Sequence, residues 1–316
     1  MGIKRTPVAI FTYNRPSHTE RTLEALARCA RLEECDLYLY CDGPRDMDAT
    51  DAVAASRRVV REWSARLTAH VIEHEENLGL ARSIVAGVTE LCAEYGRVIV
   101  LEDDLVVQPG FLDYMLQALD LYEGESQVYQ VSGYMFPVKH ILDHDAFFLP
   151  LVTTWGWATW ERAWTAFDWD GSGASKMLAD HAVRRRFDLD GSYPYSAMLQ
   201  DRLAGRNDSW GILWWWAVFR VGGLALHPRL SLVHNIGLDG SGTHWTLSAV
   251  GNQLPSEFPQ AFQIGILRVP LNATASEQAF CTIKQYLGRQ HKPSILRRLH
   301  RILQPELRSA TVQDPL

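Results

Sequence analysis

The chain has 316 residues, of which 47% are hydrophobic and 22% are charged. These proportions exclude a disordered chain, a collagen-like repeat and a multi-span membrane protein. The formal net charge of −6 gives the chain no general attraction for nucleic acid. An anionic ligand would therefore need a local device, such as a metal ion, a helix N-terminus or a few arginines.

The cysteines point to a reducing compartment. There are five, an odd number, and no CxxC pair occurs, which argues against a zinc cluster or a secreted disulfide framework. The first residues contain no long apolar stretch typical of a signal peptide, and no window has the run of apolar residues typical of a transmembrane helix. We therefore expect a cytoplasmic protein without nucleic-acid partners.

The first third of the chain alternates short apolar strands with amphipathic helices. Strands are predicted over 8–12, 36–41, 69–73 and 97–101, and helices over 17–27, 49–67 and from 77 to about 91. Ser17 and Glu20 have the spacing of a capping box at the first helix. In these strands polar and apolar residues do not alternate, and helices join the strands. This pattern predicts a parallel sheet covered on both faces.

Polar residues follow these strands directly. They are Asn14 and Arg15 after the first strand, Asp42 after the second and the acidic run 102–104 after the fourth. Ligands of parallel α/β sheets bind at the carboxyl ends of the strands, so this edge is the candidate site. No GxGxxG or GxxxxGK[ST] motif follows a strand, which disfavours a Rossmann dinucleotide site and a P-loop.

The pattern changes after about residue 106. A helix is predicted over 111–122, a strand over 128–133, and strand or turn structure over 222–228 and 230–234. Nine of the 11 tryptophans lie between Trp155 and Trp216, and a glycine-rich loop, Gly237–His244, follows. A basic amphipathic helix is predicted over Ser294–Leu303. We expect three parts: 1–105, 106–250 and a C-terminal extension, 251–316.

The acidic triplet Glu102-Asp103-Asp104 is the sharpest chemical signal. Adjacent carboxylates at the end of a buried strand repel one another, so an opposite charge is expected nearby. Carboxylate oxygens suit Mg²⁺ or Mn²⁺, and such an ion can bridge a diphosphate and neutralise a leaving group. The alternative is a solvated acidic turn with no function.

Several motifs in order resemble a GT-A glycosyltransferase of the family 2-like bacterial sugar transferases: TYNRP, CDGP, ENLGLARS and VLEDDLVVQPGF. The layout is also similar to N-acetylglucosaminyltransferase I, whose acidic triplet is likewise Glu-Asp-Asp before a leucine. The resemblance implies a GT-A fold, that is, an α/β domain with a mostly parallel central sheet and helices on both faces. It further implies a nucleotide-sugar-binding half, 1–105, an acceptor-binding half, 106–250, and a divalent cation, Mn²⁺ or Mg²⁺.

The resemblance also implies roles for individual residues. Asp104 would bind the metal, Asp103 would face the ribose or share the metal, and Glu102 would lie near the donor sugar. Asp42 would accept a hydrogen bond from the uracil imide N–H, a pairing that suits an acceptor-only carboxylate.

Three further residues would serve the donor, and a histidine would complete the metal shell. Thr12 and Arg15 would lie beside the nucleotide, and Arg82 would pair with the diphosphate. His244, delivered by the glycine loop, would be the second metal ligand, with His234 and Asp239 as weaker alternatives.

The acceptor side rests on the tryptophans and a carboxylate. Packed tryptophans fill cores by default, but Trp155 and Trp157 are candidates to floor an acceptor pocket, where a sugar lies on an indole. Asp208 is the candidate general base for the acceptor hydroxyl, with Asp201 and Asp239 as alternatives.

Together these features predict a metal-dependent, inverting glycosyltransferase that moves a sugar from a UDP-sugar to a hydroxyl of a glycan or lipid-linked acceptor. Two alternatives stay open: a sugar nucleotidyltransferase, and a catalytically degenerate module that binds sugar nucleotides or glycans. The basic C-terminal helix either contacts an anionic membrane surface peripherally or packs back on the domain.

Overall fold

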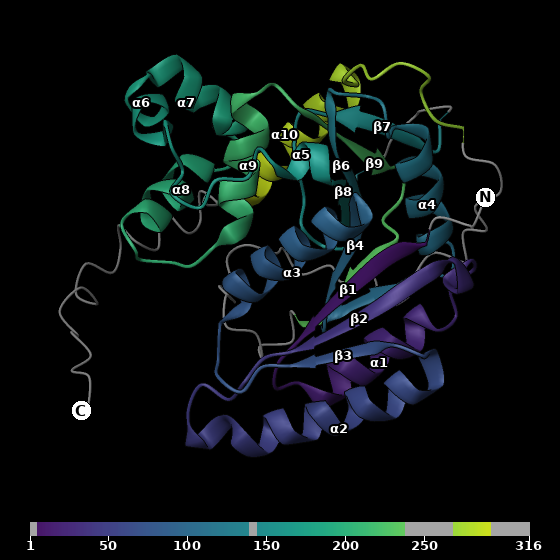
Figure 1. The fold of residues 1–316 in the computed structure, drawn as a ribbon. Helices are drawn as coiled ribbons and strands as arrows, with labels where there is room; N and C mark the ends of the chain where they lie inside the picture. Colours follow the sequence, from purple (N-terminus) through teal and green to yellow (C-terminus); the bar gives the residue numbers. More distant parts are fainter. Residues whose placement is uncertain (1–4, 139–143, 238–267, 292–316) are drawn as a thin grey trace.

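The structure, a computed structural model, describes residues 5–138, 144–237 and 268–291. An eight-stranded sheet runs through it in the order β3-β2-β1-β4-β8-β6-β9-β7 (Figure 1). Its strands are β1 (Thr6–Thr12), β2 (Cys35–Cys41), β3 (His70–Glu73), β4 (Arg97–Glu102), β6 (Val128–Ser132), β7 (Ala146–Leu149), β8 (Trp157–Trp160) and β9 (Leu224–Pro228). Only β8 and β7 run against their neighbours, so the sheet is mostly parallel. Strands β5 (Leu105–Val107) and β10 (Val233–Asn235) pair separately.

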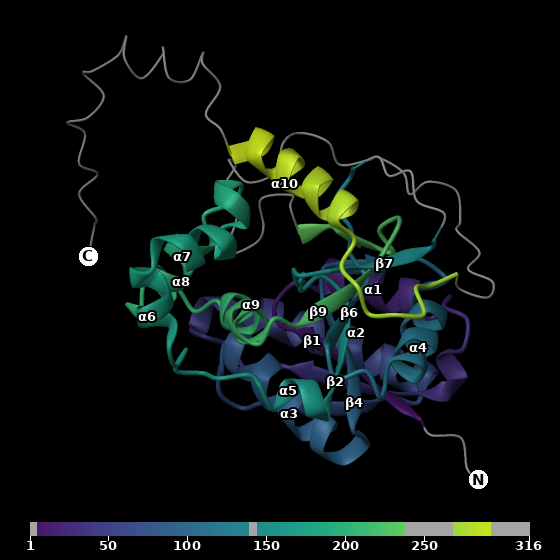
Figure 2. The same ribbon diagram turned by 90° about the horizontal axis from the view of Figure 1, so that it is seen from above.

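Helices cover both faces of this sheet, as Figures 1 and 2 show. They are α1 (Pro16–Leu26), α2 (Thr50–Leu67), α3 (Leu80–Tyr95), α4 (Phe111–Leu121), α5 (Glu161–Trp164), α6 (Ala174–Ala179), α7 (His181–Phe187), α8 (Tyr195–Leu203), α9 (Trp210–Arg220) and α10 (Glu277–His291). Helix α2 packs on β2 and β3, and α3 packs on β1 and β4. The predicted fold class, α/β with a mostly parallel central sheet, is confirmed.

The strand order reverses between β1 and β4. From β1 the chain moves outward to β2 and β3, then crosses back to β4 on the other side of β1. Right-handed crossovers in opposite directions place α1 and α2 on one face and α3 on the other. Such a reversal opens a crevice at the carboxyl ends of the two central strands. The residues that follow β1 and β4 therefore face one another across it.

The four strands and three helices predicted for the first third are present, with one correction at a helix start. Helix α1 begins at Pro16, Arg15 is its N-cap residue, and no side chain caps it, so Ser17 is not the N-cap. The physical reason is that proline has its φ already fixed near the helical value and lacks the N–H that a first-turn residue cannot use. The predicted division at residue 105 falls inside one continuous sheet, because β4 pairs with β8.

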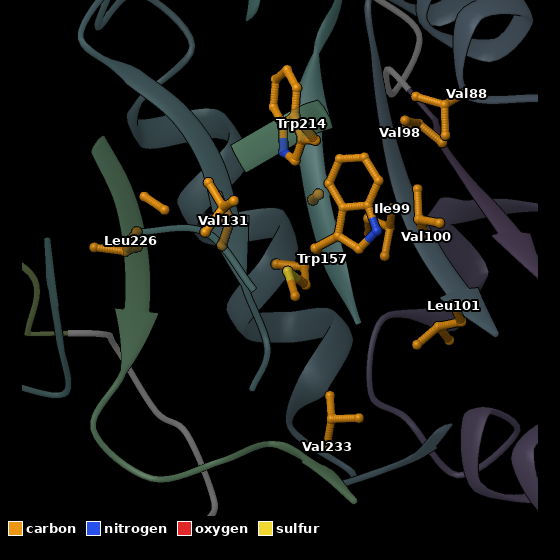
Figure 3. Packing of buried hydrophobic residues seen from close by; sticks show 14 of the residues in the cluster. Val88, Val98, Ile99, Val100, Leu101, Val131, Trp157, Trp214, Leu226 and Val233 are labelled. Atoms are coloured by element: carbon orange, nitrogen blue, oxygen red, sulfur yellow. The ribbon is translucent and has the colours of Figure 1, made fainter. Parts of the chain in front are cut away.

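The tryptophan-rich segment builds much of the second core. Trp157 of β8 has no exposed surface, and its ring lies 5.3 Å from that of Trp210 and 6.1 Å from that of Trp214. Figure 3 shows Trp157 and Trp214 packed beside apolar side chains of the central strands. Trp214 Nε1 donates to Gln130 Oε1 at 2.7 Å, so this indole is satisfied without water. A sugar cannot lie on the ring of Trp157, so its expected acceptor role is corrected to a core role.

The last described segment was not predicted from the sequence. Helix α10 buries Ala279, Ile283 and Leu287, packs on β7, and is tied by Lys284, whose Nζ lies 2.7 Å from Asp190 Oδ2. None of the described helices combines the length and apolarity that crossing a bilayer requires. The predicted basic helix, 294–303, lies outside the described residues.

Candidate active site at the carboxyl edge of the sheet

One arginine and two aspartates meet at the crevice between β1 and β4. Arg15 Nη2 lies 2.7 Å from Asp103 Oδ1 and 2.9 Å from Asp104 Oδ2, so one guanidinium nitrogen bridges both carboxylates. Both aspartates are buried, with 3% and 8% of their surface exposed. The opposite charge expected beside the acidic triplet is therefore Arg15, supplied by the segment that follows β1.

The backbone around the triplet holds these carboxylates in place. Tyr13 N donates to Asp103 Oδ2 at 3.2 Å, and Thr22 Oγ1 of α1 donates to the Asp103 carbonyl at 2.9 Å. Ile236 N, just after β10, donates to the Asp104 carbonyl at 2.9 Å. The acidic pair is thus fixed from three directions, which excludes the alternative of a solvated turn.

Two of the three acids hold their protons unusually strongly. Burial, with repulsion from Asp104 and Asp103, raises the pKa of Glu102 to about 8 even though Arg15 opposes the shift. Burial raises the pKa of Asp103 to about 6, against the attraction of Arg15. The pKa of Arg15 is itself raised: burial lowers it, but Asp103 and Asp104 more than compensate. One arginine does not neutralise the triplet, so the site retains an attraction for a further cation.

The residues present suit a divalent cation whose other coordination positions are filled by oxygen atoms of a bound ligand and of water. Within the described residues, Asp104 Oδ1 makes no hydrogen bond, whereas both oxygens of Asp103 are engaged. No cluster of three or more His, Cys, Asp or Glu side chains suited to a metal occurs in the described ranges. One or two carboxylates with phosphate and water oxygens is the usual Mg²⁺ arrangement. His244 and Asp239, the histidine and aspartate proposed for the loop, lie outside the described residues.

Gly237 closes over the acidic pair. A Cβ at this position would stand 2.1 Å from Asp104 Oδ2 and 2.8 Å from Arg15 Nη1, closer than any side chain allows. Arg15 Nη1 is buried and has no hydrogen-bond partner in the part of the chain that the structure describes. A glycine here lets the chain pass directly over the ion pair, and the unpartnered N–H groups of Arg15 suit an acceptor oxygen of a ligand.

Asp42 organises the neighbouring loops. Its carboxylate accepts four hydrogen bonds: from Gly43 N and Leu78 N at Oδ1, and from Gly79 N and Asn77 Nδ2 at Oδ2, all between 2.8 and 3.0 Å. Four is close to the full capacity of a carboxylate. Asp42 therefore links the end of β2 to the N-terminus of α3. Its predicted contact with a uracil imide stays a prediction.

Arg57 of α2 supports the same loops and was missed in the sequence. Its Nη2 lies 2.5 Å from the carbonyl of His74 and 3.3 Å from the carbonyl of Asp42. A built Cβ on Gly43 would lie 2.5 Å from the carbonyl carbon of Glu76, so the two loops touch. Arg57 stands in a helical run with no motif around it, and only the fold brings it to this edge.

The other two predicted donor residues lie at different depths. The hydroxyl of Thr12, at the end of β1, is buried and donates to the Tyr40 carbonyl at 3.1 Å. Arg82 is exposed on the outer face of α3, where it lines an open groove with Trp169. Neither position tests a contact with a nucleotide, so both roles stay predictions.

The predicted acceptor side contains the segment that enters β8. Trp155 is half-buried, and its ring meets that of Tyr134 edge-on at 4.6 Å. Since Val100 pairs with Trp157, the preceding residues run alongside the end of β4, where Glu102 lies. A Cβ on Gly211 would touch Thr154 at 3.3 Å, so the first turn of α9 adjoins the same segment.

The two described candidates for the general base, Asp208 and Asp201, have different surroundings. Asp208 is exposed and precedes Ser209, the N-cap residue of α9, whose Oγ accepts from Ile212 N. Asp201 is engaged by Arg206, whose Nη2 lies 2.6 Å away. His234, the alternative metal ligand, is half-buried in β10. Asp208 thus lies at the helix end nearest the Trp155 segment, and its catalytic role stays a prediction.

Known proteins were compared with this chain by sequence and by structure. No curated protein matches the chain. Among solved structures, S. aureus TarS is 18% identical over 47% of this chain and 25% of its own, with a TM-score of 0.33. GalNAc-T7 with UDP, GalNAc and Mn²⁺ is 10% identical over 73% of this chain and 43% of its own, with a TM-score of 0.43. The chain thus spans less than half the length of either protein.

A third solved structure is glucosyl-3-phosphoglycerate synthase from Mycobacterium tuberculosis, in complex with Mn²⁺, UDP and glucosyl-3-phosphoglycerate. It is 14% identical over 50% of this chain and 57% of its own, with a TM-score of 0.31. None of these matches bears on the expected likeness to N-acetylglucosaminyltransferase I. The segment from β1 through β8, which carries Arg15, Asp42 and the acidic triplet, matches a family model: residues 8–159 correspond to glycosyl transferase family 2.

Proposed function

We propose that the protein is a metal-dependent glycosyltransferase that moves a sugar from a nucleotide-diphosphate donor, UDP in our proposal, to a hydroxyl of a glycan or lipid-linked acceptor. The observation that carries the proposal is the buried Asp103–Asp104 pair, bridged by Arg15 at the point where the strand order reverses. The match of residues 8–159 to glycosyl transferase family 2 supports it.

The donor would lie across the carboxyl edge of β1, β2 and β4. Asp104 would hold Mn²⁺ or Mg²⁺ through its open Oδ1, and Asp103 would face the ribose or share the ion. Bound there, the cation would neutralise charge that develops on the departing diphosphate. Arg15 Nη1 would donate to an oxygen of the donor, and Asp42 would support the base through the loops that it connects, beside Thr12.

The reaction in this proposal is a direct displacement at the anomeric carbon. The acceptor oxygen forms the new bond to that carbon, the bond to the diphosphate oxygen breaks, and the acceptor proton passes to the carboxylate of Asp208. Glu102 would lie beside the donor sugar, and Trp155 would contact the acceptor. The product would have the inverted configuration, which NMR of the anomeric proton reads directly.

The experiment that tests this function measures UDP release from a panel of UDP-sugars with water as the poor acceptor, with and without Mn²⁺. We expect release that depends on Mn²⁺ and falls by about a hundredfold or more in Asp104→Asn. The matched control, Asp51→Asn, changes an exposed aspartate on α2 and should keep full activity. Release that survives both Asp104→Asn and EDTA would contradict the proposal.

The same preparations separate the two alternatives. A nucleotidyltransferase would release pyrophosphate from UTP and a sugar 1-phosphate, which a glycosyltransferase does not do. A degenerate binding module would bind UDP in a calorimeter and turn nothing over with any donor. Either result would replace the proposal.

A further inference from the structure

An open groove of about 450 Å³ runs along the outer face of α3. It is lined by Arg82, Val85, Ala86, Thr89 and Glu90 of that helix and, opposite them, by Trp169. Each of these helix residues lies three or four positions from another of them, so together they form a single stripe on the surface of α3. The groove lies between α3 and the segment that carries Trp169.

The groove presents an indole ring that is open to solvent. Trp169 is 37% exposed, unlike the tryptophans of the core, and the guanidinium carbon of Arg202 lies 5.0 Å from the centre of its ring. The wall is apolar in the middle, and charged side chains stand at its two ends. A pyranose ring has the matching pattern, an apolar C–H face with hydroxyl groups around its rim.

The groove also begins beside the donor site. Gly79 N, just before α3, is bonded to Asp42, and Arg82 lies in the first turn of the helix. From Arg82 to Glu90 the helix advances about 12 Å, which is longer than a single sugar ring. A chain of sugars whose end is at the donor can therefore continue along this face.

We propose that this groove, with Trp169 as its platform, is a subsite for the distal sugars of an oligosaccharide acceptor. The inference rests on the proposed function, since it names the class of acceptor. Glu90 would bind hydroxyl groups of the sugars that Trp169 stacks, whereas Arg82, at the donor end of the groove, keeps its predicted role beside the diphosphate. The Glu90 side chain is exposed and, within the described residues, makes no hydrogen bond or ion pair, so it is available to a ligand.

The test is binding of the full chain to a printed array of oligosaccharides, from disaccharides to hexasaccharides, by wild type and variants. We expect binding that increases with chain length and falls about tenfold in Trp169→Ala. Glu90→Gln should weaken it less. The matched control is Trp63→Ala, which removes a half-buried tryptophan on α2 with Arg66 stacked on it at 5.0 Å, and it should bind as wild type does.

Three results would overturn the subsite: no binding to any oligosaccharide, equal binding by wild type and Trp169→Ala, or equal loss in Trp63→Ala. UDP release to water, measured on the same samples, keeps the two proposals apart. It should be unchanged in Trp169→Ala, because the groove does not contact the donor sugar. Array binding that depends on Trp169, without UDP release by wild type, would contradict the glycosyltransferase and keep the groove as a glycan site.

Discussion

At the scale of single residues, the site is organised by close electrostatic contacts. Arg15 balances two buried carboxylates through Nη2, and among the described residues its Nη1 has no partner. Gly237 allows the backbone to pass over them. Because a partly neutralised acidic cluster is costly in a buried place, this arrangement favours a cationic ligand over an empty site.

Gly237→Ala tests the importance of that close passage. The added methyl group must displace either the Asp104 carboxylate or the Arg15 guanidinium, so we expect UDP release to fall by about a hundredfold. Thermal stability should change much less than activity. Gly124→Ala is the control, because a Cβ there meets nothing within 4 Å. Unchanged release in Gly237→Ala would show that the pair is not needed in its present geometry.

Asp42 gives a second prediction at this scale. It tests whether the carboxylate only positions the neighbouring loops or also contacts the nucleobase. Its acceptor positions are taken by main-chain and Asn77 N–H groups, so we expect Asp42→Asn to weaken UDP and CDP binding by the same factor. Calorimetry with the two nucleotides measures this. A selective loss for UDP would instead show that the carboxylate reads the imide N–H, which cytosine lacks.

At the scale of elements, strands and loops of the second half are tied by a buried histidine. His227 of β9 has no exposed surface; its Nε2 lies 2.9 Å from the Leu151 carbonyl and its Nδ1 3.3 Å from the Tyr134 carbonyl. Leu151 and Tyr134 belong to the segments that lead to Trp155 and follow β6. The segment that leads to Trp155, on the predicted acceptor side, is thus held in place by a residue with no exposure to solvent.

This histidine makes stability depend on pH. Burial lowers the pKa of His227 to about 4, from 6.5, so the unfolded chain binds the proton more tightly. The contribution of neutral His227 to the free energy of unfolding is fully present above about pH 6.5 and is lost as the pH falls towards 4. The total loss is about a few kcal/mol. Urea unfolding of wild type and His227→Gln at several pH values should show this slope in wild type only.

The comparison between the two proteins cancels the opposite contributions of Glu102 and Asp103, whose raised pKa values make stability fall as the pH rises. His70→Gln, at an exposed position, serves as the control. A variant with the same pH slope as wild type would show that His227 does not cause it.

At the scale of the whole molecule, a late segment covers the far edge of the sheet. Residues 268–291 reach the β7 edge, where Ala275 bridges Phe148, and the buried face of α10 follows. Tyr122, at the end of α4, donates from its hydroxyl to the Pro270 carbonyl at 2.7 Å. The far edge of the sheet is therefore completed by residues that come late in the chain.

Shortening a buried side chain of α10 tests how much this helix contributes to the stability of the domain. Ile283 has no exposed surface, so Ile283→Ala should destabilise the protein by about 2–5 kcal/mol through lost burial and a residual cavity. Leu271, in the same segment, is 87% exposed, and Leu271→Ala should lie within about 0.5 kcal/mol of wild type. Urea denaturation measures both. Equal small effects would mean that α10 adds little to the domain.

The sequence by itself determined the first half of the fold and the place of the site. Apolar strands, amphipathic helices and the acids after β4 are local patterns, and local periodicity is enough to read them. Tertiary structure alone decided which side chains meet: Arg15 with the acids, Asp42 with the start of α3, and Trp157 with the core rather than an acceptor. The start of α1 at Pro16 and the docking of α10 also depended on it. Those outcomes depend on contacts between residues far apart in the chain, whose energies no local pattern contains.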